Sequence, residues 1–94
     1  MVKVVSLKKG QSISKNEIKT SLDYARQTFQ YARFNFYNGL YIYIAYNKDQ
    51  SIEVSSNSRN ITLWQQIQSL KRVYTQARII DFLYRWLNSK DLNN

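Results

Sequence analysis

The fold is decided by the stretch YARFNFYNGLYIYIAYNKDQSIEVS, residues 31–55. Apolar or aromatic residues alternate with other residues along most of it, which is the period of a half-buried β-strand. Asn38-Gly39 is the dipeptide most typical of a two-residue hairpin turn, and the polar run at 47–50 indicates a second turn. The stretch therefore predicts three strands, from about Ala32 to Tyr37, from Leu40 to Tyr46 and from Ser51 to Ser55.

Turn geometry predicts which side chains of these strands share a face. A two-residue turn at Asn38-Gly39 sets Phe34 opposite Tyr43, and simple closure of the second turn sets Ala45 opposite Ile52. Paired residues lie on the same face of a sheet. The expected core face consists of Phe34, Phe36, Tyr41, Tyr43, Ala45, Ile52 and Val54. The opposite face consists of Tyr31, Arg33, Asn35, Tyr37, Leu40, Ile42, Ile44, Tyr46, Glu53 and Ser55.

The N-terminal part predicts a strand followed by a helix. Val2 to Leu7 is rich in β-branched residues, and the helix begins after Ser14, which forms a capping box with Glu17. The buried stripe of this helix is expected to contain Ile18, Leu22, Ala25 and Phe29. Two alternatives remain for its end, because the stripe can be extended to a cap at Gly39. The strict alternation in 33–37 favours an earlier end and a strand.

The last segment, about Ile61 to Ser89, predicts a long C-terminal helix. Unbroken, it would be about 44 Å long at the usual rise, whereas a compact domain of this length is only about 32 Å across. Its apolar face also changes direction between the two halves. Either the helix breaks near Ser69 to Thr75, or its second half packs against another surface. The second alternative predicts a homodimer through Ile79, Phe82, Leu83, Trp86 and Leu87.

Together these elements predict an α+β fold of the order β-α-β-β-β-α, with a small antiparallel sheet and helices on its core face. Residues 1–94 form a single domain on this interpretation, and 88–94 form a frayed polar tail. The α-β-β-β-α part is similar to double-stranded-RNA-binding domains in the order of its elements. The resemblance covers that order alone and assigns a role to no residue.

Composition excludes several classes of chemistry. The chain has no Cys and no His, which removes disulfides, the commonest metal ligands and the commonest general base. Its six acids form no catalytic pattern, and two glycines are too few for a phosphate-cradling loop. We therefore expect no enzyme, no metal and no cofactor. The charged N-terminus and the lack of an apolar run of about 20 residues predict a cytoplasmic protein without membrane contact.

The charge balance indicates a polyanionic partner. Fourteen Lys and Arg stand against six Asp and Glu, which gives a net charge of +8. The sequence therefore predicts a small, non-catalytic nucleic-acid-binding protein, homodimeric through its last helix. The alternative is a protein-interaction module, such as a viral inhibitor or adaptor that binds an acidic host protein. Abundant Asn, Ile, Lys and Tyr are typical of AT-rich coding, as in phages, archaeal viruses and plasmids.

Three groups of residues are candidates for contact with nucleic acid. Lys71, Arg78 and Arg85 recur every seven residues, so they form one stripe on a continuous helix. The alternative for this stripe is a solvated face whose arginines pair with Asp81. Lys8-Lys9, together with Lys3 and Arg59, is the candidate for a second basic patch. The predicted contacts are Lys71, Arg72, Arg78, Arg85, Lys8, Lys9, Arg33 and Tyr37.

The third group lies on the second face of the predicted sheet. Tyr31, Tyr37 and Tyr46 are expected there around Arg33 and Asn35. Aromatic rings beside a cation on an open sheet can stack unpaired bases. Leu40, Ile42 and Ile44 are expected at the centre of the same face. These aliphatic residues favour the alternative that a helix or a second subunit covers the face, with the tyrosines supplying interface area.

Overall fold

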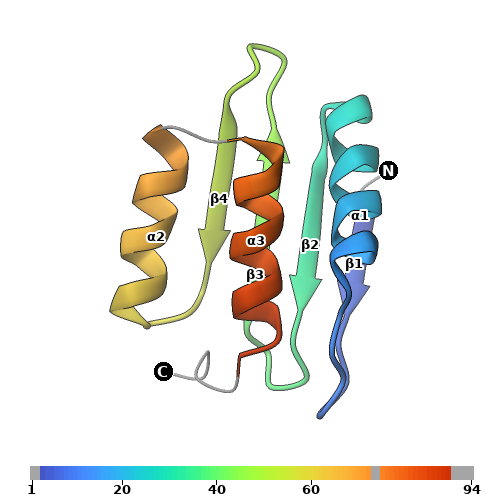
Figure 1. Ribbon diagram of the computed structural model, residues 1–94, viewed down its shortest axis with the longest axis vertical. Helices are drawn as coiled ribbons and strands as arrows, with labels where there is room; N and C mark the ends of the chain where they lie inside the picture. Colours follow the sequence, from blue (N-terminus) through green and yellow to red (C-terminus); the bar gives the residue numbers. More distant parts are fainter. Residues whose placement is uncertain (1–2, 73–74, 90–94) are drawn as a thin grey trace.

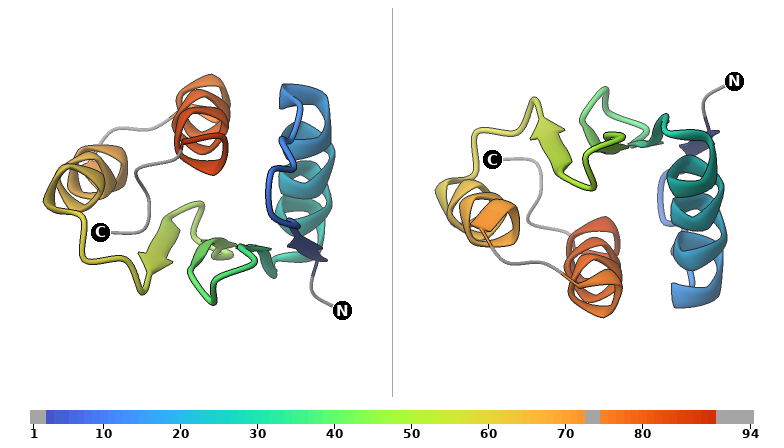
Figure 2. Two further views of the ribbon diagram at one scale, coloured as in Figure 1. Left: turned by 90° about the horizontal axis from the view of Figure 1, so that it is seen from below. Right: turned by 90° about the horizontal axis from the view of Figure 1, so that it is seen from above.

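Four strands and three helices make up the part of the chain that the computed structural model describes, residues 3–72 and 75–89. In chain order they are β1 (Lys3–Ser6), α1 (Lys15–Thr28), β2 (Tyr31–Asn35), β3 (Tyr41–Tyr46), β4 (Ile52–Ser56), α2 (Ile61–Arg72) and α3 (Gln76–Leu87). The strands form one sheet in the order β1-β2-β3-β4 (Figure 1). All three helices lie on the same side of this sheet (Figure 2). The predicted α+β class is confirmed.

The sheet is mixed, so the predicted antiparallel sheet is wrong at its first strand. β1 pairs with β2 in parallel, with Lys3 opposite Ala32 and Val5 opposite Phe34. β2, β3 and β4 pair antiparallel. The parallel pair arises because α1 carries the chain back from the end of β1 to the start of β2, as in a β-α-β unit.

The β2–β3 hairpin closes through a three-residue loop, so the predicted two-residue turn is wrong. The Phe36 N–H donates to the Leu40 carbonyl oxygen at 2.8 Å, and the Gly39 N–H donates to the Phe36 carbonyl oxygen at 3.2 Å. Gly39 has a φ of 88°, in the left-handed region. This loop is a tight turn followed by a residue in the left-handed conformation. The Asn-Gly dipeptide is compatible with this three-residue loop as well as with the two-residue turn.

The β3–β4 hairpin has the same loop length. The Asn47 N–H donates to the Ser51 carbonyl oxygen at 3.0 Å, and the Gln50 N–H donates to the Asn47 carbonyl oxygen at 3.1 Å. Gln50 takes the left-handed position, with a φ of 70°. The two hairpins therefore share one geometry, although only the first has a glycine where positive φ is required.

The two loops shift the register of β3 by one residue, which exchanges its faces. Phe34 pairs with Ile42, and Ile44 pairs with Val54. The predicted core face is therefore wrong for Tyr41, Tyr43 and Ala45, which lie on the other side. The face under the helices consists of Ala32, Phe34, Ile42, Ile44, Tyr46, Ile52 and Val54, all of them buried.

Helix α1 begins where its capping box predicts. The Glu17 N–H donates to Ser14 Oγ at 3.1 Å, and the Ser14 N–H donates to Glu17 Oε1 at 3.5 Å. The helix ends at Thr28, so the alternative extension to Gly39 is wrong. Phe29 was expected on the buried stripe, but it adopts a left-handed cap with φ 52° and its side chain is exposed. That cap turns the chain sharply into β2.

The predicted long C-terminal helix is two helices, and the predicted alternative of a break between Ser69 and Thr75 is confirmed. Thr75 caps α3, since its hydroxyl accepts from the Arg78 N–H at 3.2 Å. After the break α3 runs back beside α2 (Figure 1). The break allows each half to turn its own apolar face toward the core, which explains why that face changes direction along the sequence.

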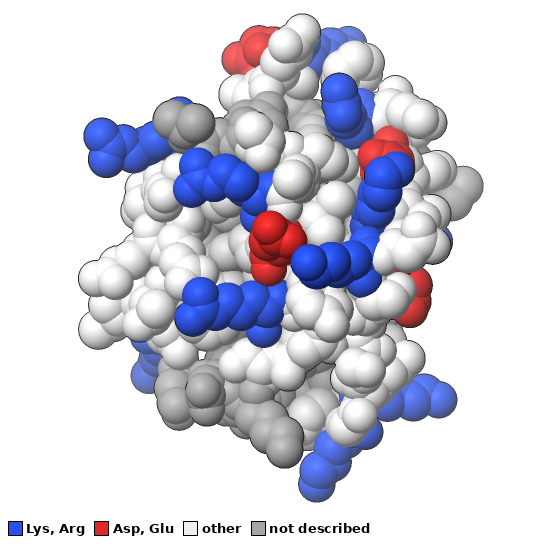
Figure 3. Space-filling model, in the orientation of Figure 1, with Lys and Arg blue, Asp and Glu red and all other residues white. Residues whose placement is uncertain are grey.

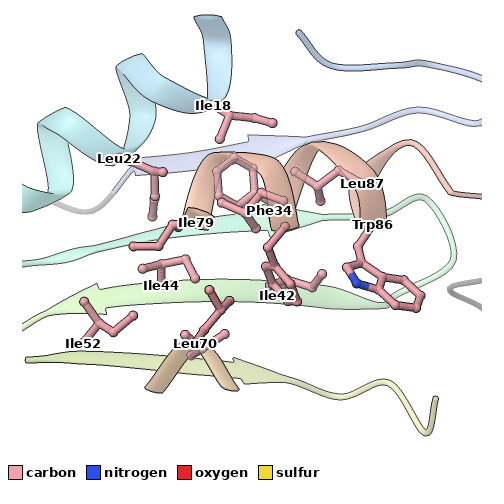
Figure 4. Close-up of a cluster of buried hydrophobic side chains, with 14 of the residues drawn as sticks. Ile18, Leu22, Phe34, Ile42, Ile44, Ile52, Leu70, Ile79, Trp86 and Leu87 are labelled. Carbon is pink, nitrogen blue, oxygen red and sulfur yellow. The ribbon is translucent and has the colours of Figure 1, made fainter. Parts of the chain in front are cut away.

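The residues predicted to form a dimer interface lie in the core of one chain. Ile79, Phe82, Leu83, Trp86 and Leu87 are all buried in the hydrophobic core. Figure 4 shows Ile79, Trp86 and Leu87 among the side chains of the sheet. Trp86 Nε1 donates to Gln66 Oε1 at 2.7 Å, which ties α3 to α2. Contacts within one chain therefore account for the apolar residues on several sides of α3. Homodimerisation stays a prediction. Of the predicted tail, 90–94 lies outside the described residues, whereas Asn88 is hydrogen-bonded to Ile13.

Candidate nucleic-acid interface

One face of the sheet has no described element over it (Figure 2). Paired positions place on this face the side chains of Val4, Ser6, Tyr31, Arg33, Asn35, Tyr41, Tyr43, Ala45, Glu53 and Ser55. We call this surface the open sheet face. It is free of the long aliphatic side chains of β3, which point to the core instead.

The centre of the open sheet face is an aromatic cluster around one cation. The rings of Tyr31 and Tyr43 lie 5.6 Å apart between centroids, and those of Tyr41 and Tyr43 lie stacked at 6.2 Å. The Arg33 guanidinium lies 4.1 Å from the centroid of the Tyr41 ring. Arg33 Nε also donates to Asn35 Oδ1 at 2.6 Å. β2 and β3, the two central strands, supply all five side chains of this tyrosine–arginine cluster.

The cluster is held in place before any ligand arrives. Arg33 is only half-buried, yet its guanidinium is fixed from two sides by the Tyr41 ring and the Asn35 amide. A side chain that is already ordered loses less conformational entropy on binding. Tyr31 is exposed and Tyr41 and Tyr43 are partly exposed, so another planar group can contact the exposed parts of these rings.

The open sheet face itself is close to neutral. Its charged side chains among the described residues are Arg33 and Glu53. The net charge of +8 is therefore carried by residues outside this face. The face is distinguished from the rest of the surface by its aromatic side chains, on which planar groups can stack. The cations elsewhere on the molecule add a long-range attraction for anions.

Arg33 lies on the face that the alternation of its strand predicts. Tyr41 and Tyr43 were expected in the core instead, because the predicted turn is one residue shorter than the observed loop. Two signals favour the observed register: Asn-Gly also fits a three-residue loop, and isoleucine is buried more often than tyrosine. With Ile42 and Ile44 in the core, the aliphatic patch that argued for a covered face is absent.

The predicted stripe of Lys71, Arg78 and Arg85 is not formed, because the chain reverses between the first residue and the other two. Arg78 and Arg85 line a groove of about 290 Å³ between α2 and α3. Arg72 lines a neighbouring hollow with Arg78. These cations lie on α2 and α3, on the side of the sheet opposite the tyrosine–arginine cluster (Figure 2). Several Lys and Arg side chains are spread over this helical side of the molecule (Figure 3).

The acid within that groove pairs with α1 in the structure. Asp81 forms an ion pair with Lys15 at 3.2 Å, and both side chains are exposed. The predicted alternative for Asp81 was pairing with Arg78 and Arg85 of its own helix, whereas the ion pair that the structure gives Asp81 joins it to α1. Such exposed pairs contribute little to stability. Lys15 offsets the acid, so the groove keeps a net positive character.

The remaining predicted residues meet at one end of the sheet. Lys8 and Lys9 lie in the loop between β1 and α1, and Tyr37 lies in the β2–β3 loop. All three line a cavity of about 440 Å³. Tyr37 therefore does not lie in the tyrosine–arginine cluster, as its predicted strand position implied. The structure divides the eight predicted contacts among the open sheet face, the helical side and this end cavity.

Asp49 is a titratable group with a structural role. Hydrogen bonds from the Ser51 hydroxyl and backbone N–H lower the pKa of the Asp49 carboxyl. The residue lies in the β3–β4 loop, so these bonds support the hairpin. Within 3–72 and 75–89, no three acidic side chains gather closely enough to hold a metal ion.

Helices long and apolar enough to cross a membrane are absent from the described part of the chain. Comparison with known proteins assigns no family: no family model, no curated protein and no solved structure matches the chain.

Proposed function

We propose that the protein binds single-stranded nucleic acid on its open sheet face, without catalysis. The observation that carries this proposal is the cluster of Tyr31, Tyr41, Tyr43 and Arg33 on the uncovered central strands. Unpaired bases stack on aromatic rings and on arginine planes. A duplex hides the flat faces of its bases, so this surface favours single strands.

The expected binding is tolerant of sequence. Every base has a π-face, and stacking on tyrosine supplies about 1–3 kcal/mol per base. Asn35 adds one side-chain amide that can hydrogen-bond a base edge, which allows only a modest preference. The net charge of +8 attracts the phosphate backbone and makes the affinity fall with salt.

A second candidate function rests on the helical side. The groove lined by Arg78 and Arg85 suits a carboxylate-rich protein segment as well as phosphates. This candidate corresponds to an interaction module with an acidic partner. It would depend on the arginines of α3 and would be indifferent to the tyrosines of β3, so the same set of variants separates the two functions.

The test compares two pairs of tyrosines on opposite sides of the molecule. Affinity is measured with an unstructured, labelled oligonucleotide of about 20 nucleotides and with its duplex, at about 50 mM salt. Replacing Tyr41 and Tyr43 by Leu should weaken single-strand binding by about 30-fold or more, since two stacking platforms are lost. The matched control replaces Tyr24 and Tyr84, which are exposed on α1 and α3, and should change affinity little.

Three results would contradict the proposal. The first is that wild-type protein leaves the single strand unbound, and the second is that it binds the duplex more tightly. Equal losses from the two tyrosine pairs would show that the open sheet face has no special part. In each case binding to an acidic polypeptide such as polyglutamate, with an Arg78→Gln and Arg85→Gln variant, tests the second candidate.

A further inference from the structure

A cavity lies at the end of the sheet where the parallel strands β1 and β2 finish. Its volume is about 440 Å³, and its walls come from the β1–α1 loop, the β2–β3 loop and the end of α3. Cavities that hold small molecules have volumes of about 300–1,000 Å³. The cavity lies outside the carboxyl ends of the parallel strands β1 and β2, where the β1–α1 and β2–β3 loops leave the sheet.

Hydrogen bonds between distant segments fix the walls. The Ile13 N–H donates to Asn88 Oδ1 at 2.9 Å, and Asn88 Nδ2 donates back to the Ile13 carbonyl oxygen at 3.1 Å. The Leu7 N–H donates to the Asn35 carbonyl oxygen at 2.8 Å, which extends the sheet into the loop. The end of α3, the start of α1 and the end of β2 are therefore held together around a preformed space.

The β1–α1 loop is itself closed locally. The Gln11 N–H donates to the Lys8 carbonyl oxygen at 2.9 Å, and the Lys8 N–H donates to Gln11 Oε1 at 2.9 Å. Gly10 takes a φ of 78° within this turn, a conformation that favours glycine. The turn sets two adjacent lysines at the edge of the cavity.

The lining combines an apolar floor with a basic edge. Leu7, Phe36 and Leu87 supply apolar surface, and Tyr37 supplies an aromatic ring that is 56% exposed. Lys8 and Lys9 supply two positive charges, and none of the described residues of the lining is Asp or Glu. This chemistry suits a ligand with a planar, largely apolar body and an attached anion.

We propose that this end cavity binds one nucleoside monophosphate, with its base against Tyr37 and its phosphate at Lys8 and Lys9. Lysine binds phosphate as a point charge, and an aromatic ring stacks any base. The nucleotide has two possible sources: a free molecule, or the end of a strand that crosses the open sheet face. Only the second source rests on the function proposed above.

The experiment follows backbone amide signals of the full chain by NMR during titration with AMP, adenosine or inorganic phosphate. AMP should shift the amides of 8–12 and 87–89 in a saturable way. Adenosine and phosphate should each bind at least about 10-fold more weakly than AMP, because adenosine lacks the phosphate group and inorganic phosphate lacks the base. Absence of AMP shifts at these amides up to millimolar concentration would overturn the proposal.

Charge-matched variants locate the phosphate. Lys8→Gln with Lys9→Gln should weaken AMP binding by about 10-fold and leave adenosine binding unchanged. Lys48→Gln with Lys71→Gln removes the same net charge from places outside the cavity lining and should leave AMP binding near the wild-type value. Equal AMP affinities in the two double variants would overturn the proposal. Tyr37→Leu should weaken AMP and adenosine alike, since both carry the base.

Two further measurements separate this inference from the proposed function. The Tyr41→Leu and Tyr43→Leu variant should keep the AMP shifts at 8–12 even where it loses oligonucleotide binding. A 5′- or 3′-phosphorylated oligonucleotide that displaces AMP identifies a strand end as the source. An oligonucleotide that binds without displacing AMP identifies the free nucleotide, and both results support the cavity as a nucleotide site.

Discussion

The two faces of the sheet are built from alternate residues of the same strands, yet they have opposite characters. Phe34, Ile42 and Ile44 are wholly buried under the helices. Arg33, Tyr41 and Tyr43, their neighbours in the sequence, lie on the open sheet face and contact one another through their π-systems. The first set stabilises the fold, and the second remains available to a ligand. One residue of register decides which set faces the helices.

The largest expected effect compares adjacent residues of β3. Ile44→Ala removes a fully buried side chain and should lower the free energy of unfolding by about 2–5 kcal/mol. Tyr43→Ala removes cross-strand contacts on the open sheet face and should lower it by only about 1 kcal/mol. Denaturant midpoints at constant slope measure both values. A larger loss of stability for Tyr43→Ala than for Ile44→Ala would indicate that Tyr43 faces the core, as the two-residue turn at Asn38-Gly39 predicts.

The second prediction asks which side of the molecule contacts the phosphates. Each phosphate that a cation neutralises on a single strand changes the slope of log affinity against log salt by about 0.7. Arg33→Gln should reduce the slope by about that amount, and the Tyr41 and Tyr43 variant should lower affinity without changing the slope. Arg78→Gln with Arg85→Gln should leave the slope unchanged. A reduction of about 1.4 in that last variant would place the strand on the helical side.

The contrast between the two faces also shows what the sequence could predict. The start of α1 is fixed by Ser14 and Glu17, which satisfy each other within one turn of helix. The positions of the three antiparallel strands follow from alternation. Their register does not, because Asn38-Gly39 fits two loop lengths, and the choice depends on whether tyrosine or isoleucine enters the core.

Long-range packing decided the features that the sequence left open. No glycine or proline marks the break between α2 and α3 in the sequence. A continuous helix and a broken one therefore differ only in their tertiary contacts, such as the hydrogen bond from Trp86 to Gln66. The end cavity was also beyond sequence reasoning. Its lysines and Tyr37 belong to loops separated by all of α1 and β2, and Asn88 joins them from the end of the described chain.

The third prediction concerns the helix that covers one edge of the buried face. Ser14→Ala should destabilise the protein by about 1 kcal/mol, the usual effect of losing a capping hydroxyl. Oligonucleotide affinity should be unchanged at temperatures where the variant is folded, since α1 lies on the far side from the tyrosines. Ser12→Ala, in the loop just before the cap, is the control and should have no effect on the denaturant midpoint. Equal midpoints for Ser14→Ala and wild type would show that the capping box contributes nothing.

The smallest expected effect comes from the two loops that set the register. Gly39 and Gln50 occupy the same left-handed position in their loops, with φ values of 88° and 70°. A side chain in this conformation costs about 1–2 kcal/mol, and glycine loses about 0.5–1 kcal/mol more backbone entropy on folding. Gln50→Gly should therefore raise the free energy of unfolding by about 0.5 kcal/mol, and Gly39→Ala should lower it by a similar or slightly larger amount. Denaturant midpoints of the two variants and wild type, measured side by side, give the sign of each change in stability.

If Gln50→Gly is destabilising instead, contacts of the Gln50 side chain outweigh the backbone strain. If Gly39→Ala is neutral, the β2–β3 loop does not need its left-handed residue, and the three-residue register loses its physical basis.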